Sequence, residues 1–136
     1  MDLLILKNEI QDKALEALTF DKEKIDDSFN VSNSSIYFYN LKFKLILLLN
    51  DVEIERTRIK KRVMLECKND VDFNLSKTAE MNTYIEADDE FCKNTILYNE
   101  LKSLIKYIED ILEGLKTKHY EMKLWLEYKK FMEGLI

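Results

Sequence analysis

The chain has 136 residues, of which 46% are hydrophobic and 35% are charged, and its formal net charge is −5. This length suits one domain, and the apolar content excludes a disordered chain. The sequence holds 2 glycines and no proline, whereas compact all-β folds place both residues in many tight turns. We therefore predict an all-α fold, a single helical domain over residues 1–136 that is built around two long helices.

The cysteines and the N-terminal residues indicate where the chain works. Cys67 and Cys92 are too few for a disulfide framework, and neither stands at a metal-ligand spacing. Asp2 occupies a place where a signal peptide carries basic residues. The longest apolar run, Leu45 to Leu49, is too short to cross a bilayer. We expect reduced thiols, no membrane partner and a cytoplasmic location.

Apolar spacing predicts two helices in the first half of the chain. The first covers residues 2–18, and a polar stretch at 21–33 separates it from a second helix at 34–67, with N-caps offered by Ser32 to Ser35. The second helix has a core stripe made of Leu41, Leu45, Leu48, Val52, Ile59 and Val63. Its first half is apolar on several faces, which favours contact with a partner subunit.

In the second half of the chain, the residue pattern predicts a loop at residues 68–76 and a short helical turn at 76–80 that is capped by Ser76. An extended segment at 83–86 and a helical region at 88–136 are expected to follow. A break is expected near Lys116 and Thr117. The last region carries a heptad seam of Leu97, Leu101, Leu104, Ile108, Ile111 and Leu115. A second stripe of Tyr98, Ile105, Leu112 and Leu126 lies on an adjoining face and favours self-association.

The sequence offers no catalytic constellation. His119 is the only histidine, so a two-histidine metal site or a histidine triad lacks its second member. The acidic run from Glu86 to Glu90 is typical of a solvated first turn of a helix. Two glycines do not make a phosphate-binding loop. We predict no enzyme, no catalytic residue, no metal site and no cofactor.

Positive charge gathers in one short window, which we call the basic cluster. Residues 56–68 hold six basic side chains against Glu66 alone, a net charge of +5, which leaves −10 for the rest of the chain. The six are Arg56, Arg58, Lys60, Lys61, Arg62 and Lys68. Helical spacing places Arg56 and Lys60 on one flank of the core stripe, Arg62 on the other, and Arg58 and Lys61 away from the core.

Two interpretations of the basic cluster stay open on the residues alone. Cations near the end of a helix complement the helix dipole, and a basic surface also binds anions. Single-stranded nucleic acid suits such a surface, because a flexible polyanion follows a basic groove without being read by sequence. The nearest aromatic residues along the chain, Tyr37 to Tyr39, lie about five helical turns earlier, and we expect most of them in the core.

Three stretches resemble the phage recombination mediators of the UvsY type. The first runs from Leu115 to Tyr120 and continues through Met122-Lys123, Phe131 and Gly134. The second is Glu80-Met81-x-Thr83-x-x-x-Ala87-Asp88, and the third is Lys60-Lys61-Arg62. The chain departs from the family pattern at His119, where the family often has Gly, and at residues 67–70, which lack the family's Gly-rich loop.

The resemblance implies a ring-like homo-oligomer, a heptamer, that binds single-stranded DNA without hydrolysing nucleotide. It also implies a RecA-like phage recombinase and the phage single-strand-binding protein as partners, in the host cell cytoplasm. Lys60 and Arg62 correspond to DNA-contacting positions of the family, and the charge pattern adds the other four cations of the basic cluster. The family's self-association element corresponds to the C-terminal helix, with Tyr120, Met122, Trp125, Leu126 and Phe131.

We therefore predict a mediator that loads the recombinase in place of the single-strand-binding protein during phage recombination, repair and recombination-dependent replication. A different class of function stays open. In a structural assembly protein, the basic cluster would pair with acidic surfaces of neighbouring subunits, since the rest of the chain carries −10. A small regulatory protein that blocks a host enzyme is a further alternative.

Overall fold

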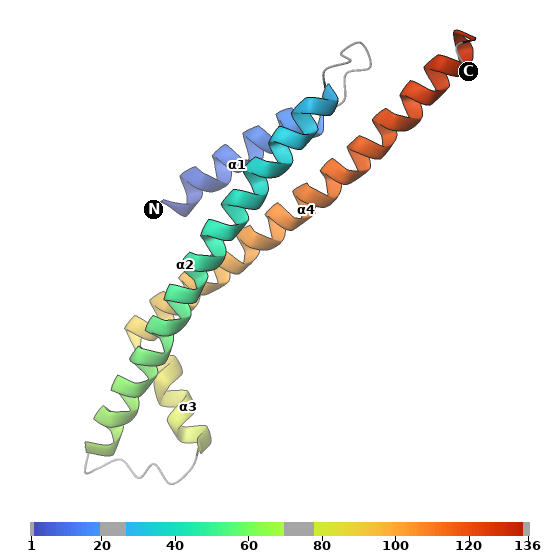
Figure 1. Ribbon diagram of the computed structural model, residues 1–136. Helices are drawn as coiled ribbons and strands as arrows, with labels where there is room; N and C mark the ends of the chain where they lie inside the picture. Colours follow the sequence, from blue (N-terminus) through green and yellow to red (C-terminus); the bar gives the residue numbers. More distant parts are fainter. Residues whose placement is uncertain (1, 20–26, 70–77, 135–136) are drawn as a thin grey trace. The chain divides into compact units, whose positions relative to one another are not determined.

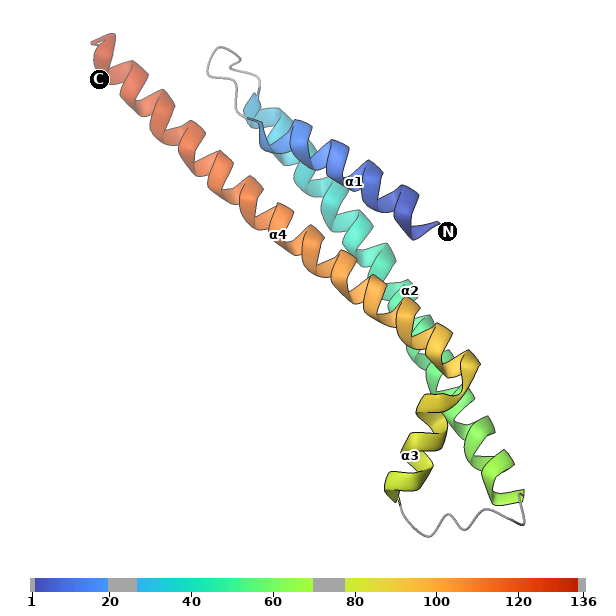
Figure 2. The same cartoon turned by 180° about the vertical axis from the view of Figure 1, so that it is seen from behind.

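The computed structural model describes residues 2–19, 27–69 and 78–134, and these residues form four α-helices and no strand. The helices are α1 (Leu3–Leu18), α2 (Asp27–Asn69), α3 (Thr78–Ala87) and α4 (Asp89–Met132) (Figures 1 and 2). The all-α prediction is confirmed, and the two long helices have 43 and 44 residues. Residue contacts divide the chain into unit 1, residues 1–44 and 104–136, and unit 2, residues 45–103.

In unit 1, α1 lies beside the first part of α2 and runs in the opposite direction (Figures 1 and 2). Asp2 caps α1, since its side chain accepts hydrogen bonds from the backbone N–H groups of Leu4 and Ile5. The buried apolar residues described in this unit are Ile10, Ala14, Phe38, Leu104, Ile108, Ile111, Leu112, Leu115 and Met122. Gly114 allows a close approach, because a Cβ atom there would lie 2.9 Å from Cδ2 of Leu18.

In unit 2, α3 packs with the end of α2 and the start of α4. Ile59, Val63 and Cys67 from α2 form one buried cluster with Ile85 from α3 and Phe91 from α4. The core stripe predicted for α2 is confirmed at Leu45, Val52, Ile59 and Val63, which are more than nine-tenths buried. Its other two members, Leu41 and Leu48, are half-buried. The heptad seam is confirmed from Leu101 to Leu115, whereas Leu97 is 37% exposed.

The start of α2 differs from the prediction. The described helix begins at Asp27, so Ser32 to Ser35 lie inside it and do not cap it. Serine and asparagine cost only about 0.5 kcal/mol each inside a helix relative to alanine, and the packing of α2 in unit 1 offsets this cost. The helix also ends later, at Asn69. The rest of the predicted loop, residues 70–76, lies outside the described residues, as does the predicted cap Ser76.

Two predictions in the second half are wrong. Residues 83–86, expected to be extended, belong to α3, because burial of Ile85 in the cluster of unit 2 decides their conformation against local β propensity. No break occurs near Lys116 and Thr117. Leu115, Lys118 and Met122 are all buried on one side of α4, so the helix continues through this point. No described helix is long and apolar enough to cross a membrane.

Candidate nucleic-acid interface

The last turns of α2 carry the basic cluster in unit 2, and its cations point in three directions. Arg56 and Lys60 line one cavity, while Arg62 pairs with acidic residues at the start of α4. Arg58 and Lys61 are exposed on the outer side of the helix. This arrangement confirms the predicted division into two flanks and an outer face. The side chain of Lys68 lies outside the described residues.

Arg56 is held in a fixed position between α2 and α4. Its Nη1 donates a hydrogen bond to Oγ1 of Thr95 at 2.8 Å and a longer one to Oδ1 of Asn94 at 3.5 Å. Its Cζ atom lies 4.3 Å from the ring centroid of Phe91 and 5.3 Å from that of Tyr98. These contacts are cation–π interactions. Arg56 therefore contributes to the packing of unit 2 as well as to its charge.

Arg62 is shared by three carboxylates. Its Nη1 lies 2.9 Å from Oε1 of Glu66, and its Nη2 lies 3.0 Å from Oδ2 of Asp88 and 2.8 Å from Oε2 of Glu90. The hydrogen bonds to Glu66 and Asp88 raise the pKa of the guanidinium above its ordinary value. One positive charge thus stands among three negative ones, and this side of the basic cluster is not a net positive surface.

Asp88 stands at the junction of α3 and α4 and organises both Arg62 and the helix start. Its Oδ2 accepts a hydrogen bond from the backbone N–H of Phe91 at 3.0 Å, as an N-cap residue does. This bond, followed by the bonds from Arg62, lowers the pKa of the Asp88 carboxyl. The predicted solvated turn is confirmed for Asp89 and Glu90, which are exposed in the first turn of α4, whereas Asp88 is half-buried and pairs with Arg62.

Among the described side chains of the basic cluster, Lys60 and Lys61 stand apart from the acidic residues. Both are exposed, and neither forms an ion pair with an acidic residue in the described part of the chain. Arg58 is also exposed but pairs with Glu55, at 2.9 Å from its Nη1 to Oε2. An exposed pair of this kind contributes little and gives way easily to another anion.

Sequence reasoning missed the aromatic residues nearest to the basic cluster. Phe91 and Tyr98 come from α4, more than thirty residues away along the chain, yet both rings lie beside Arg56. The side chain of Phe38 is buried, as expected for the aromatic residues before the cluster, whereas Tyr39 is exposed. Only the charge complementarity between residues 56–62 and 86–90 gave a sequence signal that these segments meet.

A family model described as "Recombination, repair and ssDNA binding protein UvsY" matches residues 12–135 of the chain. The chain belongs to the UvsY family. The resemblance seen in the sequence is thereby confirmed, and with it the role of a recombination mediator at the level of the family. The description of the family names DNA binding and recombination, and no enzymatic activity.

Solved structures show the same fold. Two crystal structures of the recombination mediator protein UvsY of bacteriophage T4 match this chain with TM-scores of 0.80 and 0.79. The first is 16% identical to this chain, and the match covers 93% of this chain and 96% of the T4 chain. The second is 17% identical, and the match covers 91% of this chain and 98% of the T4 chain. No curated protein sequence matches the chain.

The residues that the UvsY resemblance assigns to self-association lie at the end of α4 in unit 1, in different environments. Met122 is buried in the core of the unit, and Trp125 is half-buried with its ring centroid 5.7 Å from that of Tyr128. Tyr120 and Phe131 are largely exposed. Among the described residues, no group of three or more His, Cys, Asp or Glu side chains is placed to hold a metal ion.

Proposed function

We propose that the protein is a recombination mediator that binds single-stranded DNA through the exposed cations of the basic cluster. The observation that carries this proposal is a cluster of net charge +5 in a UvsY-family chain of net charge −5, with Lys60 and Lys61 exposed and without acidic partners in the described residues. Phosphates bound there release counterions, so the affinity falls steeply as salt is added.

The six cations contribute unequally in this proposal. Lys60 and Lys61 make the main phosphate contacts, and Arg58 joins them when it leaves the exposed carboxylate of Glu55. Arg62, a DNA-contacting position by family resemblance, reaches a phosphate only by giving up bonds to Asp88, Glu66 or Glu90. Its contribution is therefore smaller than that of a free cation, and Arg56 acts mainly by holding the surface in shape.

Self-association is the second part of the proposal. Four exposed apolar residues follow one another at helical spacing on α4: Tyr120, Leu124, Tyr128 and Phe131. Such an apolar stripe on a soluble helix is typical of an interaction surface. A homo-oligomer, a ring of seven by family resemblance, places several basic clusters along one DNA strand and multiplies a weak site.

The mediator function follows from these two parts. An oligomer that orders single-stranded DNA competes with the phage single-strand-binding protein for the same backbone. The ordered strand is then available to a RecA-like recombinase, whose filament can begin on it. The protein supplies binding energy and geometry, and it needs no nucleotide hydrolysis for either step.

The proposal is tested by titrating a labelled oligonucleotide with single variants at several salt concentrations. Lys60→Ala and Lys61→Ala are each expected to lower the affinity several-fold and to reduce the slope of log K against log salt by about one. Lys44→Ala, an exposed lysine of α2 outside the basic cluster, is the matched control and should change neither. If the lysine variants bind with unchanged affinity and slope, the cluster is not the DNA site.

A second candidate function has its own supporting observation. Arg62 and Arg58 already pair with carboxylates of this chain. The other cations of the basic cluster could pair in the same way with acidic groups of a neighbouring subunit. A non-enzymatic assembly protein of this kind would dissociate in high salt without any response to DNA. Sedimentation with and without oligonucleotide at low salt separates the two functions.

A further inference from the structure

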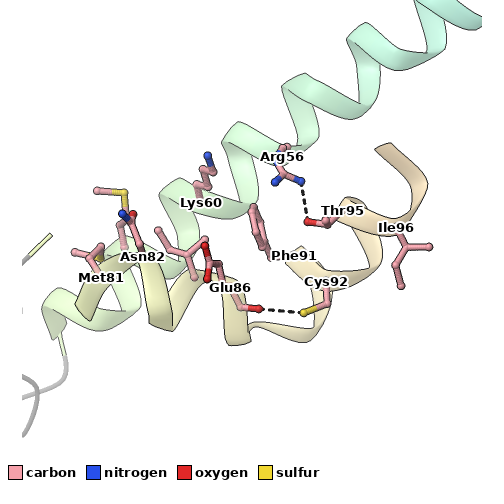
Figure 3. Close-up of a pocket in the computed structure, with 11 residues that line it drawn as sticks. Arg56, Lys60, Met81, Asn82, Glu86, Phe91, Cys92, Thr95 and Ile96 are labelled. Atoms are coloured by element: carbon pink, nitrogen blue, oxygen red, sulfur yellow. Dashed lines mark hydrogen bonds between the residues drawn. The ribbon is translucent and has the colours of Figure 1, made fainter. Parts of the chain in front are cut away.

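Unit 2 contains a cavity of about 650 Å³, and two cations of the basic cluster line it. α2 contributes Arg56, Lys60 and Met64 to its lining, α3 contributes Met81, and α4 contributes Phe91 and Ile96. Figure 3 shows the labelled lining residues and the three helices that carry them. The volume lies within the range of small-molecule sites, about 300–1,000 Å³.

The cavity combines an apolar lining with cations. Five of the eleven lining residues are methionine, isoleucine or phenylalanine, and Lys60 and Arg56 supply positive charge from α2. Lys60 is exposed, with its Nζ 5.8 Å from the ring centroid of Phe91. A ligand that matches this pattern has a flat apolar part joined to an anionic part by a short linker.

Arg56 lines this cavity with a guanidinium group that the rings of Phe91 and Tyr98 also contact. Its guanidinium lies over the ring of Phe91, and the bond to Thr95 holds its orientation before any ligand arrives (Figure 3). Bases of single-stranded nucleic acids stack on guanidinium planes as well as on aromatic rings. Asn82 and Glu86 from α3 also line the cavity; they offer hydrogen-bonding groups to a base edge, and the carboxylate of Glu86 repels a phosphate from that side.

We propose that this cavity is a base-binding subsite, which holds one base of the single-stranded DNA while Lys60 binds the adjoining phosphate. The inference rests on the proposed function and adds to it: the protein recognises the strand by an unstacked base as well as by its charge. Duplex DNA, whose bases are paired and stacked, cannot fill the cavity. The subsite thus gives a physical reason for a preference for single strands.

The test compares two oligonucleotides with the same number of phosphates, oligo(dT) and a fully abasic strand, at one salt concentration. Stacking contributes about 1–3 kcal/mol per base, so the intact protein is expected to bind oligo(dT) at least about fivefold more tightly. Ile96→Ser should reduce the ratio between the affinities for oligo(dT) and for the abasic strand. Ile54→Ser should not, since Ile54 lies outside the cavity and is 59% exposed, against 60% for Ile96.

Cys92 gives a second measurement on the unaltered chain. It lines the cavity and is exposed, whereas Cys67, the other cysteine, is buried. Oligo(dT) is expected to slow alkylation of Cys92 by iodoacetamide, and the abasic strand, at equal occupancy, is not. Equal affinity for both strands, equal protection of Cys92, or equal effects of the two serine variants would overturn the subsite while leaving DNA binding intact. Failure to bind either strand would contradict the proposed function itself.

Discussion

The end of α4 in unit 1 and the end of α2 in unit 2 present opposite chemistry on the same kind of surface, a solvent-facing helix. The first exposes an apolar stripe of Tyr120, Leu124, Tyr128 and Phe131, and the second exposes lysines. Apolar association depends on protein concentration and little on salt, whereas phosphate binding depends strongly on salt. The two surfaces are therefore separable by experiment, and the proposed function needs both.

The largest expected effect comes from placing charge on the apolar stripe. Phe131→Glu combined with Leu124→Glu should reduce the sedimenting mass toward that of a single chain, because a buried unpaired carboxylate opposes association. Affinity for a long single strand should fall about 100-fold or more as multivalency is lost. Leu15→Glu on α1 is the control, since Leu15 is 73% exposed and Phe131 71%. If the double variant sediments with an unchanged mass, the apolar stripe takes no part in self-association.

The next effect tests the packing that holds the charged surface in place. Asn94 is buried, and its Nδ2 donates a hydrogen bond to the backbone oxygen of Val52 at 3.2 Å. Asn94→Ala removes this hydrogen bond, while the Val52 carbonyl keeps its bond within α2, and should lower the free energy of unfolding by about 0.5–1.5 kcal/mol. Urea denaturation measures the change, with the exposed neighbour Lys93 replaced by Ala as the control. Equal urea midpoints for the two variants would show that the bond between Asn94 and Val52 does not stabilise the fold.

A smaller effect distinguishes the paired cations from the free ones. Arg62→Ala leaves Glu66, Asp88 and Glu90 without their shared cation, so the thermal midpoint should fall by a few degrees at low salt and by less at high salt. Lys61→Ala should leave the midpoint nearly unchanged and weaken DNA binding more than Arg62→Ala does. Calorimetry and oligonucleotide titration on both variants give the comparison. The reverse ranking in DNA binding would show that a phosphate readily displaces the carboxylates from Arg62.

The smallest effect is a pH dependence at Asp88. Because its pKa is lower in the folded chain than the ordinary value of about 3.9, the stability it contributes is present above that value and is lost as the pH falls through the lowered pKa. Asp88→Asn keeps an N-cap side chain but loses the ion pair. The difference in thermal midpoint between wild type and Asp88→Asn should be constant from pH 7 to 5 and shrink toward pH 3. A difference that does not shrink at all between pH 5 and pH 3 would exclude the ionised carboxyl as its cause.

The contacts of the candidate site show where sequence reasoning ends. Helical spacing correctly separated Arg56 and Lys60 from Arg62, because side-chain directions around one helix follow from its geometry alone. It did not reveal that Phe91 lies under Arg56 or that Asp88 holds Arg62. The residues of each pair are more than twenty positions apart in sequence, and no periodicity within a segment encodes which segments meet.

The sequence by itself determined that the chain is helical, that α2 and α4 bury regular apolar stripes, and that positive charge gathers at residues 56–68. These are local properties, set by residue spacing and composition. The tertiary structure alone decided that residues 83–86 are helical, that Arg62 pairs with Asp88 and Glu90, and that Lys60 and Lys61 have no acidic partner among the described residues. The physical reason is that burial and ion pairing depend on which helices pack together, and packing overrides local preferences of a few tenths of a kcal/mol per residue.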